Sequence, residues 1–282
     1  MVKIDDNSTA NLDVLAKQHY TALTNKKRIN GEYKKTESLI GRIQNQLAKD
    51  ILFPDRVRFW GYFLENHFRN LERIIISRPD ELQTIISEID LKFGINFLSN
   101  NISYNSATLS DFGKVVRDVI SYEWYRNTDK PAFYFSKFNI IFCPYCNKDE
   151  VQNIEKIDLA TGNTLTTRLY QLDHFYPRSR YPYLSLSFFN LIPGCSTCNA
   201  TLKGEKDFNI TTHFNPFHIS FNEYFEFYVN SIIPNNPSEI IISYNNLNTH
   251  HENQIVDLVG SNPAFPIRAS FNLDKRKLES KS

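Results

Sequence analysis

The stretch that decides the fold begins with Cys143-Pro-Tyr-Cys146 and ends with Gly194-Cys195-Ser-Thr-Cys198-Asn199-Ala-Thr-Leu-Lys203, and it contains all four cysteines of the chain. Between the two cysteine pairs lie Leu172-Asp173-His174-Phe175-Tyr176-Pro177 and Phe188-Phe189-Asn190-Leu191-Ile192. Two Cys-x-x-Cys pairs suit one tetrahedral zinc ion, because each pair offers two thiolates from a tight turn. The pattern predicts a structural Zn²⁺ site formed by Cys143, Cys146, Cys195 and Cys198.

Two disulfides in a secreted protein are the alternative interpretation of the cysteines. The N-terminal residues Met1 to Ser8 contain no apolar segment of the kind that a secretory signal needs. No uninterrupted apolar run approaches the roughly 18 residues that would mark a membrane span. We therefore expect a cytoplasmic protein with no membrane association, in which paired cysteines bind a metal ion.

The composition is that of an ordinary globular protein with an aromatic core. The chain has 282 residues, of which 41% are hydrophobic and 22% charged, and it contains 22 Phe and 15 Tyr. Its formal net charge of +1 does not indicate a nucleic-acid binder. If DNA is the substrate, the positive field must be local, or a protein partner must supply part of it.

Helical periodicity dominates the first part of the chain. Apolar residues recur at three- and four-residue steps over 39–51, 57–75, 82–89 and 109–122. Ser77-Arg78-Pro79-Asp80-Glu81 has the features of a helix start: a capping hydroxyl, a first-turn proline and early acidic residues. We predict a helical region over residues 1–130, which binds DNA or a partner, and expect the aromatic residues Trp60, Phe63 and Phe68 to be core.

The period changes near residue 130, where a second region over residues 131–282 is predicted to begin. We expect a short strand over 138–142 and a hairpin from 151–157 and 165–172, whose second strand delivers Asp173 and His174. A strand over 190–194 and a helix from Ser196 to Lys203 that ends at Gly204 are expected to follow. Further strands are expected at 225–229 and 240–244, a short helix over 250–260, and a basic tail from Arg268. The fold class is therefore α+β, with the order ββα around the second cysteine pair.

The spacing of Asp173-His174, Asn190, Asn199 and Lys203 resembles that of the HNH endonucleases, whose ββα-metal fold holds one catalytic divalent ion. The resemblance covers roughly residues 140–217. It implies that Asp173 and Asn199 bind this ion, that His174 is the general base, and that Asn190 restrains the loop that orients the base. Many members carry Gly-Gly in that loop, whereas this chain has Ser179-Arg180-Tyr181-Pro182-Tyr183, which makes the loop stiffer and more aromatic.

A narrower resemblance concerns the string Asp-His-Phe-Tyr-Pro-Arg-Ser-Arg-Tyr-Pro and the later Asn-Leu-Ile-Pro-Gly-Cys. This combination looks like the HNH subunits of Septu-type anti-phage defence systems, in which the nuclease works with an ATPase partner. The resemblance implies a protein partner of the kind found in those systems, an ATPase subunit, and a role as an effector in defence.

The chemistry of phosphodiester hydrolysis is consistent with these residue types. A neutral imidazole with a pKa of about 6.5 accepts a proton from water at cellular pH, which suits His174. Mg²⁺ or Mn²⁺ prefers oxygen ligands and keeps several waters, so one carboxylate and one amide oxygen suffice to hold it. Lys203 lies one helical turn after Asn199 and is expected to contact a phosphate, as are Arg178 and Arg180.

The sequence thus predicts a metal-dependent endonuclease that hydrolyses DNA. Two alternatives stay open: a non-catalytic zinc-dependent module that binds nucleic acid or protein, and a nuclease that acts on RNA. A complete set of Asp173, His174 and Asn199 favours the enzyme over the non-catalytic module, because a decayed site would usually have lost one of them.

Overall fold

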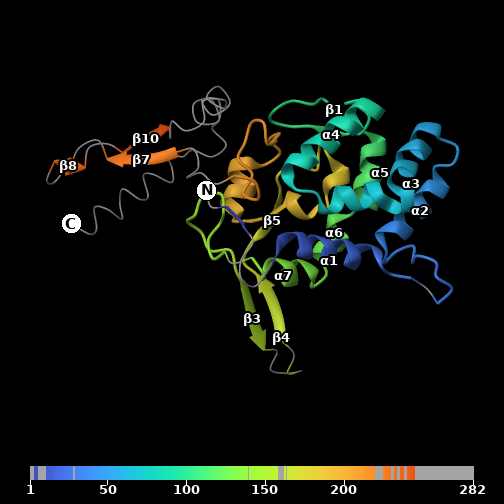
Figure 1. Ribbon diagram of the computed structural model, residues 1–282, viewed down its shortest axis with the longest axis horizontal. Coiled ribbons are helices and arrows are strands. Elements are labelled where there is room, and N and C mark those ends of the chain that lie inside the picture. The colour runs from blue at the N-terminus through green and yellow to red at the C-terminus, as the bar shows by residue number, and fades with distance from the viewer. Residues whose placement is uncertain are drawn as a thin grey trace.

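The structure is a computed structural model that describes residues 3–5, 11–27, 29–138, 140–157, 162, 164–219, 225–229, 232–233, 236–237 and 240–244. It is α+β, and its N-terminal region is helical as predicted (Figure 1). The helices are α1 (Leu12–Thr24), α2 (Leu39–Lys49), α3 (Pro54–Ile76), α4 (Pro79–Phe93), α5 (Asp111–Val119), α6 (Tyr122–Arg126) and α7 (Lys130–Phe135). Within the described part of the chain, none of them combines the length and the apolar character that crossing a membrane requires.

The strands form small antiparallel pairs. These are β1 (Ser99–Asn100) with β2 (Thr108–Leu109), β3 (Asn153–Ile157) with β4 (Thr164–Arg168), β5 (Gln171–His174) with β6 (Leu191–Gly194), β7 (Phe225–Val229) with β10 (Ile240–Tyr244), and β8 (Ile232–Ile233) with β9 (Asn236–Pro237). The β3–β4 hairpin projects from the body of the protein (Figure 1).

The structure differs from the predicted strands in two places. Asp173 and His174 do not lie on the second strand of the hairpin but on the separate strand β5, which pairs with β6. The strand expected over 138–142 is reduced to an isolated bridge between Phe142 and Glu150. The helix expected over 250–260 and the tail from Arg268 lie outside the described residues.

The helix starts follow local chemistry, with one correction. Pro79 is the first residue of α4, and Asp80 and Glu81 occupy its first turn, where acidic side chains favour the helix dipole. The expected capping hydroxyl of Ser77 does not cap α4, because Ser77 is the residue that ends α3. The predicted stripe of α4 is buried and consists of Leu82, Ile85, Ile86 and Ile89.

Helix α3 is broken in its middle, where the periodicity alone predicted about five continuous turns. Asn66, His67 and Phe68 adopt positive φ angles of 49°, 57° and 65°. The break frees carbonyl groups, and the Nδ2 of Asn70 donates to the backbone oxygen of Tyr62 at 2.9 Å. This amide replaces part of the lost helical hydrogen bonding.

An aromatic core fills the helical region. Trp60 and Phe63 are fully buried, as predicted, and Phe59 packs edge-on against both. Phe68, which lies at the break in α3, is only partly buried and packs against this core. The Nε1 of Trp60 donates to the Oδ2 of Asp50 at 2.8 Å, which satisfies its polar atom inside the core. Buried residues on both sides of residue 130 belong to one hydrophobic cluster, so the two predicted regions share a core.

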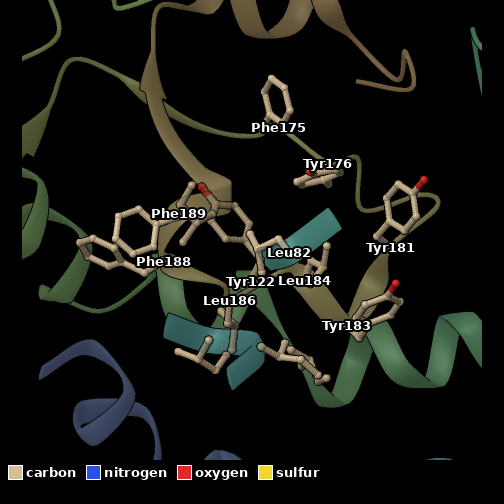
Figure 2. Packing of buried hydrophobic residues seen from close by; sticks show 14 of the residues in the cluster. Leu82, Tyr122, Phe175, Tyr176, Tyr181, Tyr183, Leu184, Leu186, Phe188 and Phe189 are labelled. Carbon is tan, nitrogen blue, oxygen red and sulfur yellow. The ribbon is translucent and has the colours of Figure 1, made fainter. Parts of the chain in front are cut away.

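The loop over 175–190 joins β5 to β6 and docks onto the helical region. Its aromatic side chains are buried, and Figure 2 shows Tyr181 and Tyr183 on one side of Leu82 and Tyr122, and Phe188 on the other side, within one hydrophobic cluster. The Oγ of Ser187 donates to the backbone oxygen of Ile74 at 2.6 Å. The aromatic composition that distinguishes this loop therefore anchors it to the helices.

His19 of α1 is a fully buried histidine with one unsatisfied nitrogen. Its Nε2 donates to the backbone oxygen of Leu186 in the loop at 2.9 Å, and its ring lies edge-on to Tyr125 and Tyr134. The Nδ1 atom is buried and has no partner among the described residues. Protonation would place an uncompensated charge there, and burial lowers the pKa of His19 from 6.5 to about 4.

This histidine is expected to make the protein less stable in acid. Because the folded-state pKa is depressed, the unfolded chain binds the proton first, so stability is complete above pH 6.5 and falls toward pH 4. The loss attributable to His19 is about 3 kcal/mol, at roughly 1.4 kcal/mol per pKa unit. Urea unfolding at pH 7 and pH 4 should show this loss in the wild type and a smaller loss in His19→Phe. Equal losses in both would contradict the assignment.

Candidate metal centre and active site

The four cysteines lie together as predicted. Their Sγ atoms all lie within 4.8 Å of one another, and Cys146 and Cys195 are 3.9 Å apart. Sulfurs at the corners of a tetrahedron around zinc are separated by about 3.8 Å, given a Zn–S distance of about 2.3 Å. All four are free thiols, so the structure does not support the disulfide alternative. The donor set and its size fit a structural zinc ion.

Backbone geometry shapes both cysteine pairs. The amide of Asn147 donates to the backbone oxygen of Cys143 at 2.7 Å, and Asn147 has a φ of 52°, which turns the chain immediately after Cys146. In the second pair, the amide of Cys198 donates to the Sγ of Cys195 at 3.4 Å. Amide donors of this kind stabilise a thiolate, which is the form that binds metal.

Because the four thiols lie so close together, their pKa values shift in opposite directions. Hydrogen bonds from Cys143 and Cys198 lower the pKa of Cys146, whereas hydrogen bonding to Cys143 and Cys146 raises the pKa of Cys198. A single cation at the centre removes this competition, because coordination deprotonates a thiol outright. The chemistry of the cluster therefore also favours a bound metal ion.

Asp173 is buried and held from two directions. Its Oδ2 accepts from the hydroxyl of Tyr145 at 2.5 Å, and its Oδ1 accepts from the Nζ of Lys203 at 2.9 Å. Asp173 and Lys203 are each 2% exposed. Tyr145 lies between Cys143 and Cys146, so the first cysteine pair positions this carboxylate directly.

The segment η3 (Thr197–Lys203) lies against β5, and two of its side chains contact two side chains of that strand. Asn199 donates through Nδ2 to the Oε1 of Gln171 at 2.8 Å, and Lys203 contacts Asp173. Gln171 and Asp173 share one face of β5, and Asn199 and Lys203 lie about one turn apart on η3, so each residue of one pair contacts one residue of the other. The predicted helix is present and ends at Gly204, but it is π-helical, with the Gly204 amide donating to the Asn199 carbonyl.

This arrangement leaves oxygen atoms that fit a hard divalent ion. The hydrogen bonds from Lys203 and Tyr145 use two of the roughly four lone-pair sites of the Asp173 carboxylate. Because Asn199 donates through Nδ2, its Oδ1 is left as an acceptor. One carboxylate and one amide oxygen suit Mg²⁺ or Mn²⁺, although the ammonium of Lys203 weakens the attraction by like-charge repulsion.

His174 is held in one orientation. Its Nε2 donates to the backbone oxygen of Ser185 at 3.0 Å, and its ring lies edge-on to Tyr122 with 4.6 Å between centroids. In the neutral ring this fixes Nδ1 as the proton acceptor. Burial lowers the pKa of His174 well below 6.5, and the charges of Arg178 and Lys203 lower it further, so the imidazole is neutral at cellular pH.

Asn190 closes the loop that carries the Ser185 carbonyl. Its Oδ1 accepts from the amide of Tyr176 at 2.7 Å, and its Nδ2 donates to the backbone oxygens of Tyr176 and Leu184 at 3.2 and 3.1 Å. The side chain is fully buried. Asn190 therefore ties Tyr176, at the start of the loop, to Leu184. The next residue, Ser185, has the backbone oxygen that accepts the hydrogen bond from His174.

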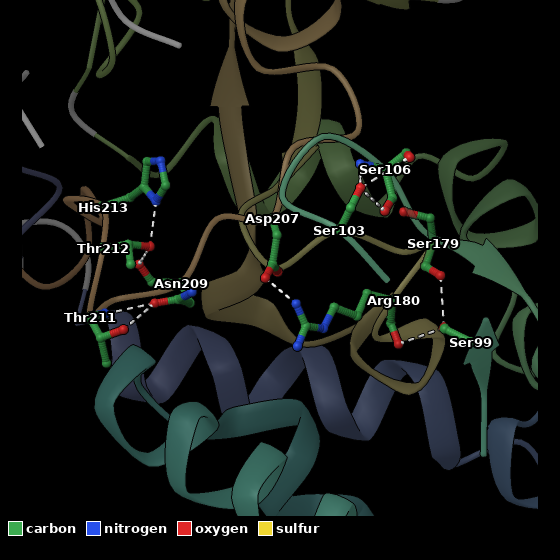
Figure 3. Close-up of polar contacts among 10 residues, drawn as sticks. All are labelled: Ser99, Ser103, Ser106, Ser179, Arg180, Asp207, Asn209, Thr211, Thr212 and His213. Carbon is green, nitrogen blue, oxygen red and sulfur yellow. Dashed lines mark hydrogen bonds and ion pairs between the residues drawn. The ribbon is translucent and has the colours of Figure 1, made fainter. Parts of the chain in front are cut away.

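The two arginines of the loop lie in different environments. Arg178 lines a pocket with His174, but its Nη1 contacts the Oε1 of Glu123 at 2.7 Å and its guanidinium lies over the Tyr122 ring. Arg180 is outside that pocket and forms an ion pair with Asp207, while the Oγ of Ser99 holds its backbone oxygen (Figure 3). Its position is that of a structural ion pair.

The predicted catalytic residues meet in one polar pocket of about 580 Å³. Asp173, His174, Asn199 and Lys203 all contribute to its lining. The sequence did not identify Tyr145 as a site residue, although its position between Cys143 and Cys146 was a usable signal. Arg126 and Arg168 were also missed, because no sequence motif includes them. Asn190 lies behind the pocket and acts on its geometry through the loop.

A comparison of the chain with protein-family models, with curated proteins and with solved structures finds no match.

Proposed function

We propose that this chain is a metal-dependent endonuclease of the HNH type that hydrolyses phosphodiester bonds of DNA. The observation that carries the proposal is the convergence of His174, Asp173 and Asn199 on one pocket beside a four-cysteine cluster. A fixed neutral imidazole next to oxygen ligands for a hard cation is the equipment that phosphodiester hydrolysis requires.

In this proposal His174 is the general base. Its Nδ1 takes a proton from a water molecule as the water oxygen attacks phosphorus and the bond to the 3′ oxygen breaks. The 3′ oxygen then takes up a proton from solvent, which leaves a 5′-phosphate and a 3′-hydroxyl. Asn190 and Ser185 keep the imidazole aimed through the contacts described above. A Mg²⁺ or Mn²⁺ ion held by Asp173 and Asn199 would stabilise the charge that develops on the phosphate and the leaving oxygen.

The four-cysteine cluster has a structural role in this proposal. A zinc ion with four thiolates has no open coordination position and therefore performs no chemistry. Through Tyr145 and through Cys198, which precedes Asn199, the cluster positions both proposed ligands of the catalytic ion. A non-catalytic zinc module would not require an oriented histidine in the lining of the same pocket.

The proposal is tested by incubating the zinc-loaded protein with a DNA duplex and with an RNA of the same sequence. We expect cleavage of DNA that requires added Mg²⁺ or Mn²⁺ and yields 5′-phosphate ends, measured by gel electrophoresis and end-specific ligation. Cleavage of RNA alone would make the chain an RNA nuclease. Failure to cleave either substrate, with co-purified partners present, would leave the zinc-dependent binding module as the function.

A protein partner belongs to the same proposal. With a formal net charge of +1, the chain has little long-range attraction for DNA, so another subunit would supply much of the binding. The resemblance to Septu-type subunits suggests an ATPase partner and a defence role. Affinity purification of the chain from its native cells, followed by mass spectrometry, would identify that partner.

A further inference from the structure

Arg126 and Arg168 form a pair of basic side chains in the wall of the pocket. They come from different elements, α6 and β4, and the Nη2 of Arg168 donates to the backbone oxygen of Arg126 at 2.7 Å. This hydrogen bond places the Arg168 guanidinium beside the C-terminal end of α6. The Arg168 guanidinium is therefore held next to Arg126, although the two residues are 42 positions apart in sequence, and both side chains line the same pocket.

Neither arginine is neutralised within the described part of the chain. Arg126 and Arg168 form no ion pair with a described carboxylate, in contrast to Arg73, Arg178 and Arg180, each of which contacts at least one acidic side chain. Four basic residues line the pocket, namely Arg126, Arg168, Arg178 and Lys203, against the acidic residues Asp173 and Glu205. The pocket is thus more positive than a protein of net charge +1 would suggest, and it suits an anion.

The arginine pair lies close to the proposed base. Tyr122 and Arg126 are four residues apart on α6 and share one face, with a rise of about 6 Å between them. The Tyr122 ring contacts the His174 ring at 4.6 Å between centroids. A strand whose scissile phosphate lies at His174 would therefore bring a neighbouring phosphate toward Arg126.

We propose that Arg126 and Arg168 together bind the phosphate next to the scissile one on the substrate strand. Guanidinium groups suit this task because they present planar donors that match phosphate oxygens in pairs. The inference depends on the proposed nuclease function, and it assigns the α6–β4 wall as the part of the site that positions the strand. Both are positioning residues and take no part in proton transfer.

The test is the salt dependence of DNA binding. Fluorescence anisotropy in Mg²⁺-free buffer would compare Arg126→Gln, Arg168→Gln and the double variant with the wild type on a labelled duplex. Because the two arginines share one phosphate, the double variant should lower the log–log salt slope by about 0.9, the value for one phosphate contact on duplex DNA. Each single variant should bind more weakly than the wild type and lower the slope by less than the double variant does, because the remaining arginine still contacts the phosphate.

Two controls separate charge from structure. Arg69→Gln removes an exposed arginine that does not line the pocket and should bind as the wild type does. Arg126→Lys keeps the charge and should retain most of the salt slope that Arg126→Gln loses. Equal slopes for Arg126→Gln, Arg168→Gln and Arg69→Gln would overturn the inference, as would additive losses of two full contacts in the double variant.

Cleavage assays on the same variants distinguish a failure of the proposed arginine site from a failure of the proposed nuclease function. If the wild type cleaves DNA and the arginine variants bind it normally, the nuclease function stands and the arginine site is wrong. If the wild type cleaves nothing but the arginine variants lose the salt slope, the binding site stands and the catalytic proposal fails. In an active enzyme, Arg126→Gln should lower kcat/KM, with the unfolding midpoint unchanged.

Discussion

Cys146→Ala is expected to yield protein that neither retains zinc nor folds. Structural zinc sites contribute on the order of 10 kcal/mol to folding, which is comparable to the whole stability of a typical domain. Cys146 is the informative choice because it is half-exposed, whereas the other three ligands are buried. Its replacement creates no large cavity, so a severe effect reports the loss of a metal ligand.

The measurement combines elemental analysis with thermal unfolding. The wild type should carry one zinc per chain and should lose its cooperative unfolding transition when a strong chelator removes the ion. Cys146→His offers zinc a nitrogen ligand in place of sulfur and should recover part of the zinc content and solubility that Cys146→Ala loses. A soluble, cooperatively folded Cys146→Ala protein would show that the cluster does not hold a structural ion.

The parts of the fold that the sequence predicted are those with short-range signals. The cysteine cluster was predictable because each pair forms a tight turn, and four thiolates then have one tetrahedral solution. The buried stripe of α4 was predictable because a first-turn proline fixes where the helix begins. Strand β6 and segment η3 were predicted close to their observed bounds, with Gly204 marking the end of the helix, whereas the separate strand β5 was not predicted.

The parts that were missed depend on contacts between distant segments. The Tyr145–Asp173–Lys203 network joins residues that are 28 and 30 positions apart, and no periodicity encodes such a meeting. Arg180 was expected beside Arg178 at the substrate, yet the turn after Pro177 directs it to Asp207 instead. The break in α3 was also missed, because Asn70 compensates for it through a side-chain hydrogen bond that apolar spacing does not show.

His174→Ala is expected to reduce DNA cleavage by roughly 100- to 10,000-fold, which is the usual effect of removing a general base. The substitution also removes the hydrogen bond to Ser185 and leaves its buried carbonyl unpaired, at a cost of about 1–3 kcal/mol in stability. That cost is too small to unfold a zinc-stabilised protein. The variant should therefore keep its zinc content and its cooperative unfolding transition while cleavage is lost.

A matched control is available in His218, a half-exposed histidine that does not line the pocket. His218→Ala should cleave DNA at the wild-type rate under the same metal concentrations. If His174→Ala also cleaved at that rate, another group would have to activate the water, and the HNH assignment would fail. Loss of zinc or of folding in His174→Ala would instead assign the residue a structural role.

Chemical rescue distinguishes a base from a residue that merely orders the pocket. His174 lines the pocket, so its removal should leave a space that connects with solvent and admits imidazole. Added imidazole should raise the cleavage rate of His174→Ala in a saturable manner, because a free base can then accept the proton from water. It should not rescue a variant such as Asn190→Ala, whose defect would be the geometry of the loop between Tyr176 and Leu184. Equal rescue of both variants, or of neither, would remove the evidence that the imidazole of His174 itself accepts the proton.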